Sequence, residues 1–350
     1  MTGSRRIGRL LAAATTAALI AGSAGCAGGM VFSPAGPPAG TGQARPAVVR
    51  TGTGRLITEP GAGFGVVYRL IGRARHSIDL TVYELADTTA EHDLAAAARR
   101  GVRVRVILDH HERYHNQAAF SYLRARRVRV VWSSPRYTYT HQKTLVTDGG
   151  TAVIMTANLT SRYYPTSRDF LVTDTSKADI AAITATFDAD FAGRAIRPAG
   201  GRDLVWSPTS AQAKLLALID GARHSLRVYF EEMADTTIEN ALIRAARRGV
   251  RVQVCGENGF GDYDRDFARL ARAGVAVSYF SSSHGLYIHA KVVEADFGTP
   301  RAAMFVGSEN FSVTSLTANR ELGLIISSRA ALASVARTFA TDFGRGKRWH

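Results

Sequence analysis

Cysteine and lysine are the residues that this chain nearly lacks. It contains two cysteines, Cys26 and Cys255, and its 44 basic residues are 39 arginines and 5 lysines. Only Cys255 lies beyond the amino-terminal segment, so the main body of the chain cannot rely on an intramolecular disulfide, and Cys255 is predicted to be a buried free thiol. The hydrophobic core must suffice, and a 46% hydrophobic composition over about 300 residues can supply one.

A long apolar run is also missing after residue 25. The amino terminus has a short one, the 15 residues Leu10–Ala24, preceded by an arginine-rich stretch at 4–9. Such a run is too short for a comfortable membrane span and is typical of a signal peptide, which we predict for residues 1–25. Ser23-Ala24-Gly25-Cys26 resembles a bacterial lipobox, so we predict lipidation of Cys26, with ordinary cleavage nearby as the alternative.

The next segment, residues 26–52, is rich in Gly, Pro and Ala and has no hydrophobic pattern. This composition predicts a flexible tether. The expected location of the protein is therefore outside the cytoplasm. It is either a lipoprotein at the outer face of the cytoplasmic membrane or a secreted protein.

Acidic residues are fewer than basic residues, 29 against 44. The formal net charge is +15, and it is +12 without Arg5, Arg6 and Arg9, because residues 1–25 contain no acid. A basic chain favours an anionic partner, either phospholipid headgroups or nucleic acid. The arginines are spread along the chain rather than gathered in a tail, so charge does not choose between lipid and nucleic acid.

Two of the few lysines stand in the same tripeptide pattern. His141-Gln142-Lys143 and His289-Ala290-Lys291 begin 148 residues apart, and an aspartate, Asp148 or Asp296, follows each at the same spacing. Residues two apart on a strand face the same side, so each His and its Lys point together. Chance placement would give far fewer than one such pair. Nearly all other basic residues of the chain are arginines, so lysine at these two positions indicates that a compact ammonium is needed beside the imidazole.

The similarity between the two halves extends beyond these motifs. Residues 98–104 (ARRGVRV) occur again at 246–252, which is also 148 residues later. After the second motif the distance between equivalent residues becomes 152. A unit of this length is far longer than a solenoid repeat, so it indicates a duplicated domain. We predict a first domain at 53–198 and a second at 199–350, in a monomeric protein.

Each domain is predicted to be α/β. Ile78–Tyr83 alternates like a strand, a helix follows from Asp87 or Thr88 to about Arg100, and Val102–Leu108 alternates again. Gly101 ends the helix. This βαβ order predicts a parallel component in a mixed sheet flanked by helices.

The motifs resemble those of the phospholipase D superfamily, whose signature H-x-K-x4-D-x6-G-S-x-N occurs once per half. The second half continues with Gly307-Ser308-Glu309-Asn310 after a longer spacer. The first half continues with Met155-Thr156-Ala157-Asn158, in which Met155 replaces the glycine and Thr156 the serine. Because of Met155, a catalytically inactive relative stays open as an alternative. The resemblance covers roughly residues 55–345 and implies two pseudo-symmetric domains with one active site at their interface.

The resemblance also implies which residues act. The catalytic residues it implies are His141, Lys143, Asp169, His289, Lys291 and Glu321. The substrate-binding residues it implies are Thr156, Asn158, Ser308 and Asn310. Asp148 and Asp296 are expected to brace the fold.

Two imidazoles can serve as nucleophile and acid, two ammoniums supply positive charge, and a carboxylate on each imidazole fixes its tautomer. By resemblance His141 is the nucleophile, forming a phosphohistidine, and His289 the acid, with the reverse assignment left open. No metal or other cofactor is implied. A cluster after one strand, Asp109-His110-His111-Glu112 with His115, places His111 and His115 four apart, which could suit a metal, although a polar loop at the site mouth is the favoured interpretation.

The predicted function is therefore a metal-independent phosphodiesterase. We expect a phospholipase D that hydrolyses or transphosphatidylates anionic or zwitterionic phospholipids, yielding phosphatidic acid on hydrolysis. The alternatives are a secreted endonuclease of the same superfamily, a cardiolipin-synthase-like transferase, and a non-catalytic lipoprotein that binds anionic surfaces.

Overall fold

The computed structural model describes residues 49–50, 54–281 and 285–350, and these described residues belong to one compact unit. The predicted signal peptide, Cys26 and most of the predicted tether lie outside the described residues. Val49–Arg50, at the end of that tether, form β1 and pair with β2 (Gly54–Glu59), so the first sheet begins before residue 53. In the described ranges no helix has both the length and the apolar character of a membrane span.

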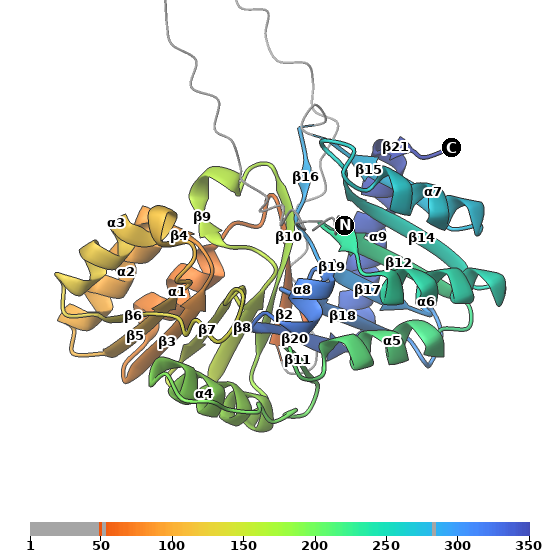
Figure 1. Cartoon of the computed structure of the whole chain (residues 1–350). Coiled ribbons are helices and arrows are strands. Elements are labelled where there is room, and N and C mark those ends of the chain that lie inside the picture. Colours follow the sequence, from red (N-terminus) through yellow and green to blue (C-terminus); the bar gives the residue numbers. More distant parts are fainter. Residues whose placement is uncertain (1–48, 51–53, 282–284) are drawn as a thin grey trace, which may run out of the picture. The chain divides into compact units, whose positions relative to one another are not determined.

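The first half of the repeat is built on a mixed sheet with the strand order β1-β2-β10-β8-β7-β3-β5-β6 (Figure 1). Strands β3, β5 and β6 run parallel, as the βαβ pattern predicts, and the other neighbours pair antiparallel. The remaining strands are β3 (Ser77–Val82), β5 (Arg103–Leu108), β6 (Arg129–Trp132), β7 (Thr144–Thr147), β8 (Thr151–Met155) and β10 (Ser167–Asp174).

The second half repeats this arrangement in the order β11-β20-β18-β17-β12-β14-β15, to which β21 (Lys347–Arg348) adds an edge. Its strands are β11 (Leu204–Ser207), β12 (Ser225–Phe230), β14 (Arg251–Glu257), β15 (Ala276–Phe280), β17 (Val292–Ala295), β18 (Ala303–Gly307) and β20 (Glu321–Ile326). The order of strands counted from β2 in the first sheet matches the order counted from β11 in the second, so equivalent strands of the repeat occupy equivalent positions. The predicted α/β class with two pseudo-symmetric mixed sheets is confirmed.

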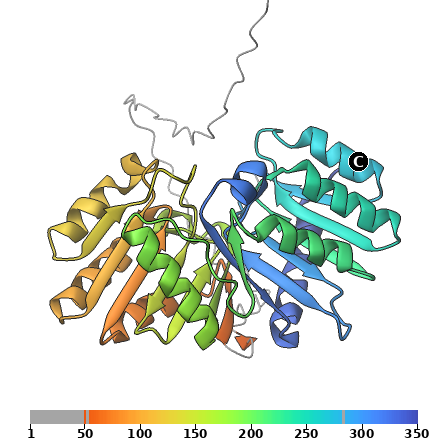
Figure 2. The ribbon, with the colours of Figure 1, turned by 60° about the horizontal axis from the view of Figure 1, so that its bottom comes forward.

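Helices flank both sheets. In the first half they are α1 (Gly65–Arg73), α2 (Thr88–Arg99), α3 (Arg113–Arg124) and α4 (Lys177–Phe191). In the second half they are α5 (Ala211–Gly221), α6 (Thr236–Arg247), α7 (Asp264–Arg272), α8 (Val313–Thr317) and α9 (Arg329–Arg345). Figure 2 shows α4, in green, across one face of the first sheet. The carboxylates of Asp87 and Asp235 accept hydrogen bonds from the first-turn N–H groups of α2 and α6, which fixes where both helices begin.

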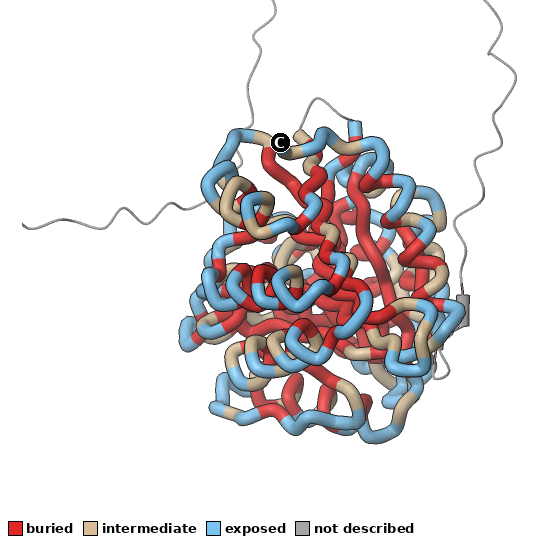
Figure 3. The backbone as a smooth tube through the Cα atoms, turned by 90° about the vertical axis from the view of Figure 1, so that its right-hand side faces the viewer, coloured by how far each residue is buried: buried red, intermediate tan, exposed pale blue. Residues whose placement is uncertain are grey.

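The two halves share part of their core. One buried cluster combines Phe170 of β10 with Trp206 of β11 and Phe339 of α9, while each half also has a cluster of its own. Figure 3 shows that buried backbone is concentrated inside the layers of helices. A buried ion pair ties the halves further, because Arg168 Nε donates to Asp342 Oδ2 at 2.6 Å. This shared core joins the two sheets, and the candidate site lies where residues of both halves meet.

Candidate active site

Two short pairings across the repeat position the histidines. β16 (Tyr287–Ile288) of the second half pairs parallel with β10 of the first, with Arg168 opposite Ile288. Thr140 of the first half forms an isolated parallel bridge with Arg320 of the second. The residues that follow the first pairing are His289 and Asp169, and those that follow the second are His141 and Glu321. Each pairing therefore places a histidine beside an acid of the other half.

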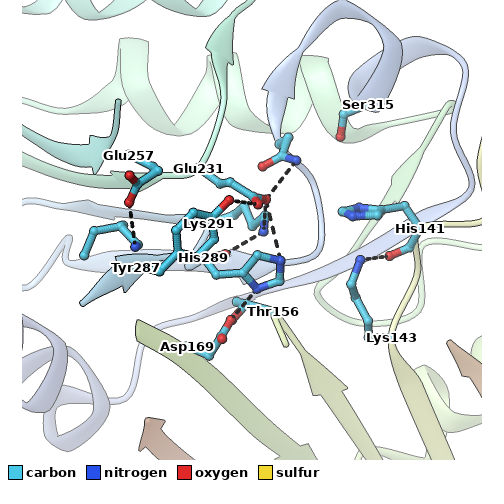
Figure 4. Close-up of polar contacts among 12 residues, drawn as sticks. His141, Lys143, Thr156, Asp169, Glu231, Glu257, Tyr287, His289, Lys291 and Ser315 are labelled. Atoms are coloured by element: carbon cyan, nitrogen blue, oxygen red, sulfur yellow. Dashed lines mark hydrogen bonds and ion pairs between the residues drawn. The ribbon is translucent and has the colours of Figure 1, made fainter. Parts of the chain in front are cut away.

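The consequence is a crossed arrangement of histidines and acids. His141 Nδ1 lies 2.8 Å from Glu321 Oε2, and His289 Nδ1 lies 2.8 Å from Asp169 Oδ1. Each imidazole is therefore oriented by a carboxylate from the other half of the repeat. Figure 4 shows His141 and His289 pointing toward one another from opposite sides of the site. In both pairs Nδ1 faces the carboxylate and Nε2 faces away from it, although His289 Nε2 lies 3.6 Å from Glu231 Oε2.

His141 sits in the more apolar surroundings. Its ring packs edge-on against Tyr83, with the ring centroids 4.7 Å apart. Burial lowers the pKa of His141, Glu321 opposes this, and the charges of Lys143 and Lys291 lower it further. Burial would raise the pKa of Glu321, but the charge and hydrogen bond of His141 outweigh it, so that pKa is below its ordinary value. The pair is thus a carboxylate with an imidazole that favours its neutral form.

The carboxylates are themselves fixed by hydroxyl and amide groups. Glu321 Oε1 accepts hydrogen bonds from Ser315 Oγ at 2.6 Å and from Asn319 Nδ2 at 2.9 Å. Asp169 accepts one from the hydroxyl of Thr156, which in turn accepts a hydrogen bond from Phe170 N. Because each acid is held by a further side chain, the orientation of each imidazole is determined before any ligand arrives.

Both motif lysines are fully buried. Lys143 Nζ donates to the carbonyl of His141 at 2.5 Å and lies 5.0 Å from the centre of the Tyr83 ring. Burial lowers the pKa of Lys143 to about 7. Lys291 Nζ donates to the carbonyl of His289 at 2.5 Å and also to Glu231 Oε2 at 2.7 Å. The two lysines are therefore equivalent in position but not in partners.

Glu231 is a site residue that the sequence analysis missed. It follows β12 at the position that Tyr83 occupies after β3, 148 residues earlier. Its Oε2 atom also accepts from Asn310 Nδ2 at 3.3 Å and lies 3.6 Å from His289 Nε2. The signal in the sequence was this Tyr-to-Glu difference three residues before the Ala-Asp-Thr-Thr segment that both halves share.

The predicted substrate-binding residues fall into two groups. Asn158 and Asn310 each have a buried side-chain oxygen with no hydrogen-bond partner among the described residues. Thr156 and Ser308 are fully buried, and their hydroxyls bond Asp169 and the backbone of Leu322. The amides thus have unused hydrogen-bonding capacity, whereas the hydroxyls are bonded to residues of the neighbouring strands β10 and β20.

Asp148 and Asp296 occupy equivalent turns after β7 and β17, away from the histidines. Both have positive φ, 52° and 54°. Each carboxylate accepts hydrogen bonds from three consecutive backbone N–H groups, at 75–77 for Asp148 and 223–225 for Asp296. These contacts join the turn to the segment that leads into β3 or β12.

The histidine cluster after β5 adjoins the site. Asp109, His110 and His111 have potential ligand atoms within 4.8 Å of one another, so these three could hold a metal ion. His115 instead contacts Glu112, with its Nδ1 atom 2.6 Å from Oε2, so the His111–His115 pair considered as the less favoured alternative is not the one assembled. Asp109 Oδ2 already accepts a hydrogen bond from the backbone N–H of Thr140 at 2.6 Å. This contact supports the strand segment that carries His141.

Comparison with known proteins gives one family and several similar folds. Residues 67–191 and 215–343 each match the family described as cardiolipin synthase, PLD-like domain. No curated protein sequence matches the chain. Phosphatidylserine synthase from Haemophilus influenzae has a TM-score of 0.66 at 12% identity, over 87% of this chain and 89% of that one.

Polyphosphate kinase from Porphyromonas gingivalis has a TM-score of 0.65 at 17% identity, over 82% of this chain, which spans 50% of the kinase. The phospholipase D family member Nuc from Salmonella typhimurium is 23% identical over 42% of this chain and 96% of its own, with a TM-score of 0.38. At these identities the likeness to solved structures is one of fold.

Proposed function

We propose that this chain, which belongs to the PLD-like domain family of the phospholipase D superfamily, is a metal-independent phosphodiesterase whose single active site is built by both halves. The observation that carries the proposal is the crossed pairing of His141 with Glu321 and of His289 with Asp169. It supplies two oriented imidazoles beside two lysines. That set provides a nucleophile, an acid and fixed positive charge, which phosphodiester cleavage requires.

In the proposed mechanism His141 is the nucleophile. Its Nε2 atom attacks phosphorus, the bond to the leaving alcohol breaks, and His289 gives its Nε2 proton to that alcohol oxygen. Water then attacks the phosphohistidine, His289 takes a proton from the water, and the phosphomonoester leaves His141. Lys143 and Lys291 stabilise the negative charge that develops on the phosphoryl oxygens.

The assignment of roles is supported by the different surroundings of the two imidazoles. His289 has a carboxylate near each ring nitrogen, Asp169 at Nδ1 and Glu231 at 3.6 Å from Nε2. Carboxylates on both sides of the ring hold it in a fixed orientation, which suits a group that passes a proton to the leaving oxygen. Burial lowers the pKa of His141, which has one carboxylate partner, and thereby favours the neutral form that a nucleophile must have.

The proposed substrate is a phospholipid. The net charge of +12 without Arg5, Arg6 and Arg9 favours an anionic surface. The predicted tether of about 25 residues would reach roughly 25–30 Å, which keeps the site close to headgroups if Cys26 is lipidated. The second candidate is transfer of the same phosphatidyl group to an alcohol, which the cardiolipin synthase description of the family favours. A secreted endonuclease is the alternative that the same basic charge allows.

One assay separates these functions. The full chain is incubated with phosphatidylcholine, phosphatidylglycerol or plasmid DNA in the presence of EDTA, with and without added glycerol. We expect release of choline from phosphatidylcholine. Variants His141→Asn and His289→Asn should each lose about 10³-fold or more in rate, because the two residues act as a unit. Phosphatidylglycerol formed from phosphatidylcholine and glycerol would indicate transfer, nicked plasmid would indicate a nuclease, and binding without turnover would contradict an enzymatic role.

We also propose that the protein is a lipoprotein anchored through Cys26. The support is the apolar stretch of residues 10–24 followed by a lipobox-like sequence. In a fractionation experiment the wild-type protein should sediment with membranes, and Cys26→Ser should appear in the medium with its activity on a soluble short-chain lipid intact. Wild-type protein found free in the medium, beginning at a residue other than Cys26, would contradict the anchor.

A further inference from the structure

Glu231 makes the two halves of the site chemically unequal. Its Oε2 atom accepts hydrogen bonds from Lys291 Nζ at 2.7 Å and Asn310 Nδ2 at 3.3 Å, and it lies 3.6 Å from His289 Nε2. Figure 4 shows its carboxylate between Lys291 and His289. These three groups are the second half's share of the phosphoryl-binding groups in the proposed mechanism. One carboxylate oxygen therefore stands where a phosphoryl oxygen would be expected.

This carboxylate is held firmly and remains charged. Tyr287 donates a hydrogen bond to its other oxygen at 2.6 Å, and 18% of the Glu231 side chain is exposed. Burial would raise the pKa of Glu231, but the charges of His289 and Lys291 outweigh it and hold the pKa well below its ordinary value. Glu231 therefore stays charged at any ordinary pH. A ligand must replace it as the acceptor from Lys291 and Asn310 while Glu231 remains nearby as an anion.

In the part of the chain that the structure describes, the first half has no such occupant. Tyr83 stands at the equivalent position, and its hydroxyl donates to Glu112 at 2.6 Å, away from the lysine. Lys143 makes its one described hydrogen bond to the carbonyl of His141. Among the described residues, therefore, no carboxylate hydrogen-bonds Lys143, whereas the protein's own carboxylate occupies the phosphoryl-binding groups of the second half.

We propose that Glu231 is an internal anion that occupies the second half of the phosphoryl site at rest and makes the site select phosphodiesters over phosphomonoesters. A phosphodiester has one negative charge and exchanges one oxygen for the Glu231 oxygen on Lys291 and Asn310. A phosphomonoester or inorganic phosphate has up to two charges and places the second beside the displaced carboxylate, where like charges repel. Return of Glu231 also favours release of the monoester product. The identity of the site as phosphoryl-binding rests on the proposed function.

The test measures binding of inorganic phosphate to the full chain by calorimetry at neutral pH and low salt, so it needs no turnover. Glu231→Gln keeps the shape of the side chain and removes its charge. It should bind phosphate at least about tenfold more tightly than wild type, because the repulsion between like charges is gone. The matched control is Glu232→Gln, which removes the same charge one residue along, from a carboxylate that bonds Ser312. Its phosphate affinity should change by less than about threefold.

Unchanged or weaker phosphate binding by Glu231→Gln, in protein with a wild-type melting temperature, would overturn the proposal and make Glu231 a positioning residue for Lys291. A tenfold gain in both variants would overturn it too, since the effect would then be one of general charge. A second measurement compares inhibition of phosphodiester turnover by phosphate, which should become stronger in Glu231→Gln. If wild type cleaves no phosphodiester but Glu231→Gln still binds phosphate more tightly, the proposed function is wrong. The proposal that Glu231 occupies an anion-binding site is then still supported.

Discussion

Lys143 shows how a single buried residue sets the working range of the site. Its ammonium has no carboxylate within hydrogen-bond distance among the described residues and is fully buried behind Tyr83. Burial lowers its pKa to about 7, although the negative charge of Glu321 partly opposes the shift. A lowered lysine pKa means that the charged form is lost as pH rises through that value. The positive charge available to a phosphoryl group therefore depends on pH near neutrality.

The pH profile of kcat/KM should reflect this residue. With a soluble short-chain phosphodiester, kcat/KM should fall as pH rises above about 7, because Lys143 loses its proton. The acid limb should lie below the ordinary histidine range, because burial lowers the pKa of His141 and keeps it neutral to lower pH. Initial rates between pH 4.5 and 10 would measure both limbs. An alkaline limb only near the ordinary lysine pKa would show that Lys143 retains its charge in the free enzyme.

At the scale of residues, the sequence predicted the participants better than their partners. The repeated motifs and the late acids identified both histidines, both lysines, Asp169 and Glu321 as neighbours of one site. Glu231 was missed because it belongs to no motif, and its role arises from a side chain that reaches Lys291 across 60 residues of chain. A substitution at one repeat position can be recognised in a sequence, but its contact can only be measured in a structure.

At the scale of elements, the turns after β7 and β17 carry the most constrained aspartates. Asp296 accepts hydrogen bonds from the backbone N–H groups of Arg223, His224 and Ser225. It also has a φ of 54°, which an alanine adopts only with strain. Loss of this carboxylate leaves several backbone donors without a partner at the entry to β12. The same geometry around Asp148 makes the two turns a matched pair.

Asp296→Ala should therefore lower the free energy of unfolding by roughly 2–4 kcal/mol, because unpaired donors cost about 1–3 kcal/mol and the positive φ adds strain. Denaturant unfolding monitored by circular dichroism would measure the change. The rate per folded molecule should stay near that of wild type. Asp148→Ala is the companion variant and should lose less stability, because the N–H groups at 75–77 are exposed and water can replace the carboxylate there. A loss of kcat at unchanged stability would instead place the carboxylate in contact with substrate.

The order of the strands was largely accessible from the sequence, but the link between the halves was not. The repeat, the βαβ spacing and the alternation of Ile78–Tyr83 predicted two equivalent mixed sheets. β16 is only two residues long, and its pairing with β10 joins segments 120 residues apart. A period of two tells which side chains share a face and does not tell which distant strand will be the neighbour. The crossed arrangement therefore appeared only in the structure.

At the scale of the whole molecule, the crossing makes each half depend on the other for a complete histidine–acid pair. His141 depends on Glu321, 180 residues away, and His289 depends on Asp169, 120 residues away. The shared core and the Arg168–Asp342 ion pair hold these partners in register. A change of an acid in one half should therefore disturb the step carried out by the histidine of the other half.

Leaving-group chemistry can reveal which step each acid serves. Protonation by His289 is needed for an alkyl alcohol, such as a lipid headgroup, but a nitrophenolate leaves without it. Asp169→Asn should therefore lose about 10²-fold or more on a headgroup diester, which is typical of a lost general acid, and lose much less on a nitrophenyl phosphodiester. Glu321→Gln should lose activity on both substrates, because it impairs attack by His141 whatever group leaves. The burst rate of alcohol release, or kcat/KM, on the two substrates measures this difference, because both report the first step and exclude hydrolysis of the phosphohistidine, in which His289 also acts.

The variants His141→Asn and His289→Asn serve as references for this comparison. With crossed pairs, Glu321→Gln must follow the pattern of His141→Asn, and Asp169→Asn that of His289→Asn, although each acid lies in the other half of the chain. If each acid variant instead follows the histidine of its own half, the crossing does not operate in the working enzyme. If the nitrophenyl substrate rescues His141→Asn and Glu321→Gln, the pairs are crossed but the roles of the two histidines are reversed. The two substrates thus test the pairing and the assignment of nucleophile separately, because pairing decides which variants behave alike and the assignment decides which pair is rescued.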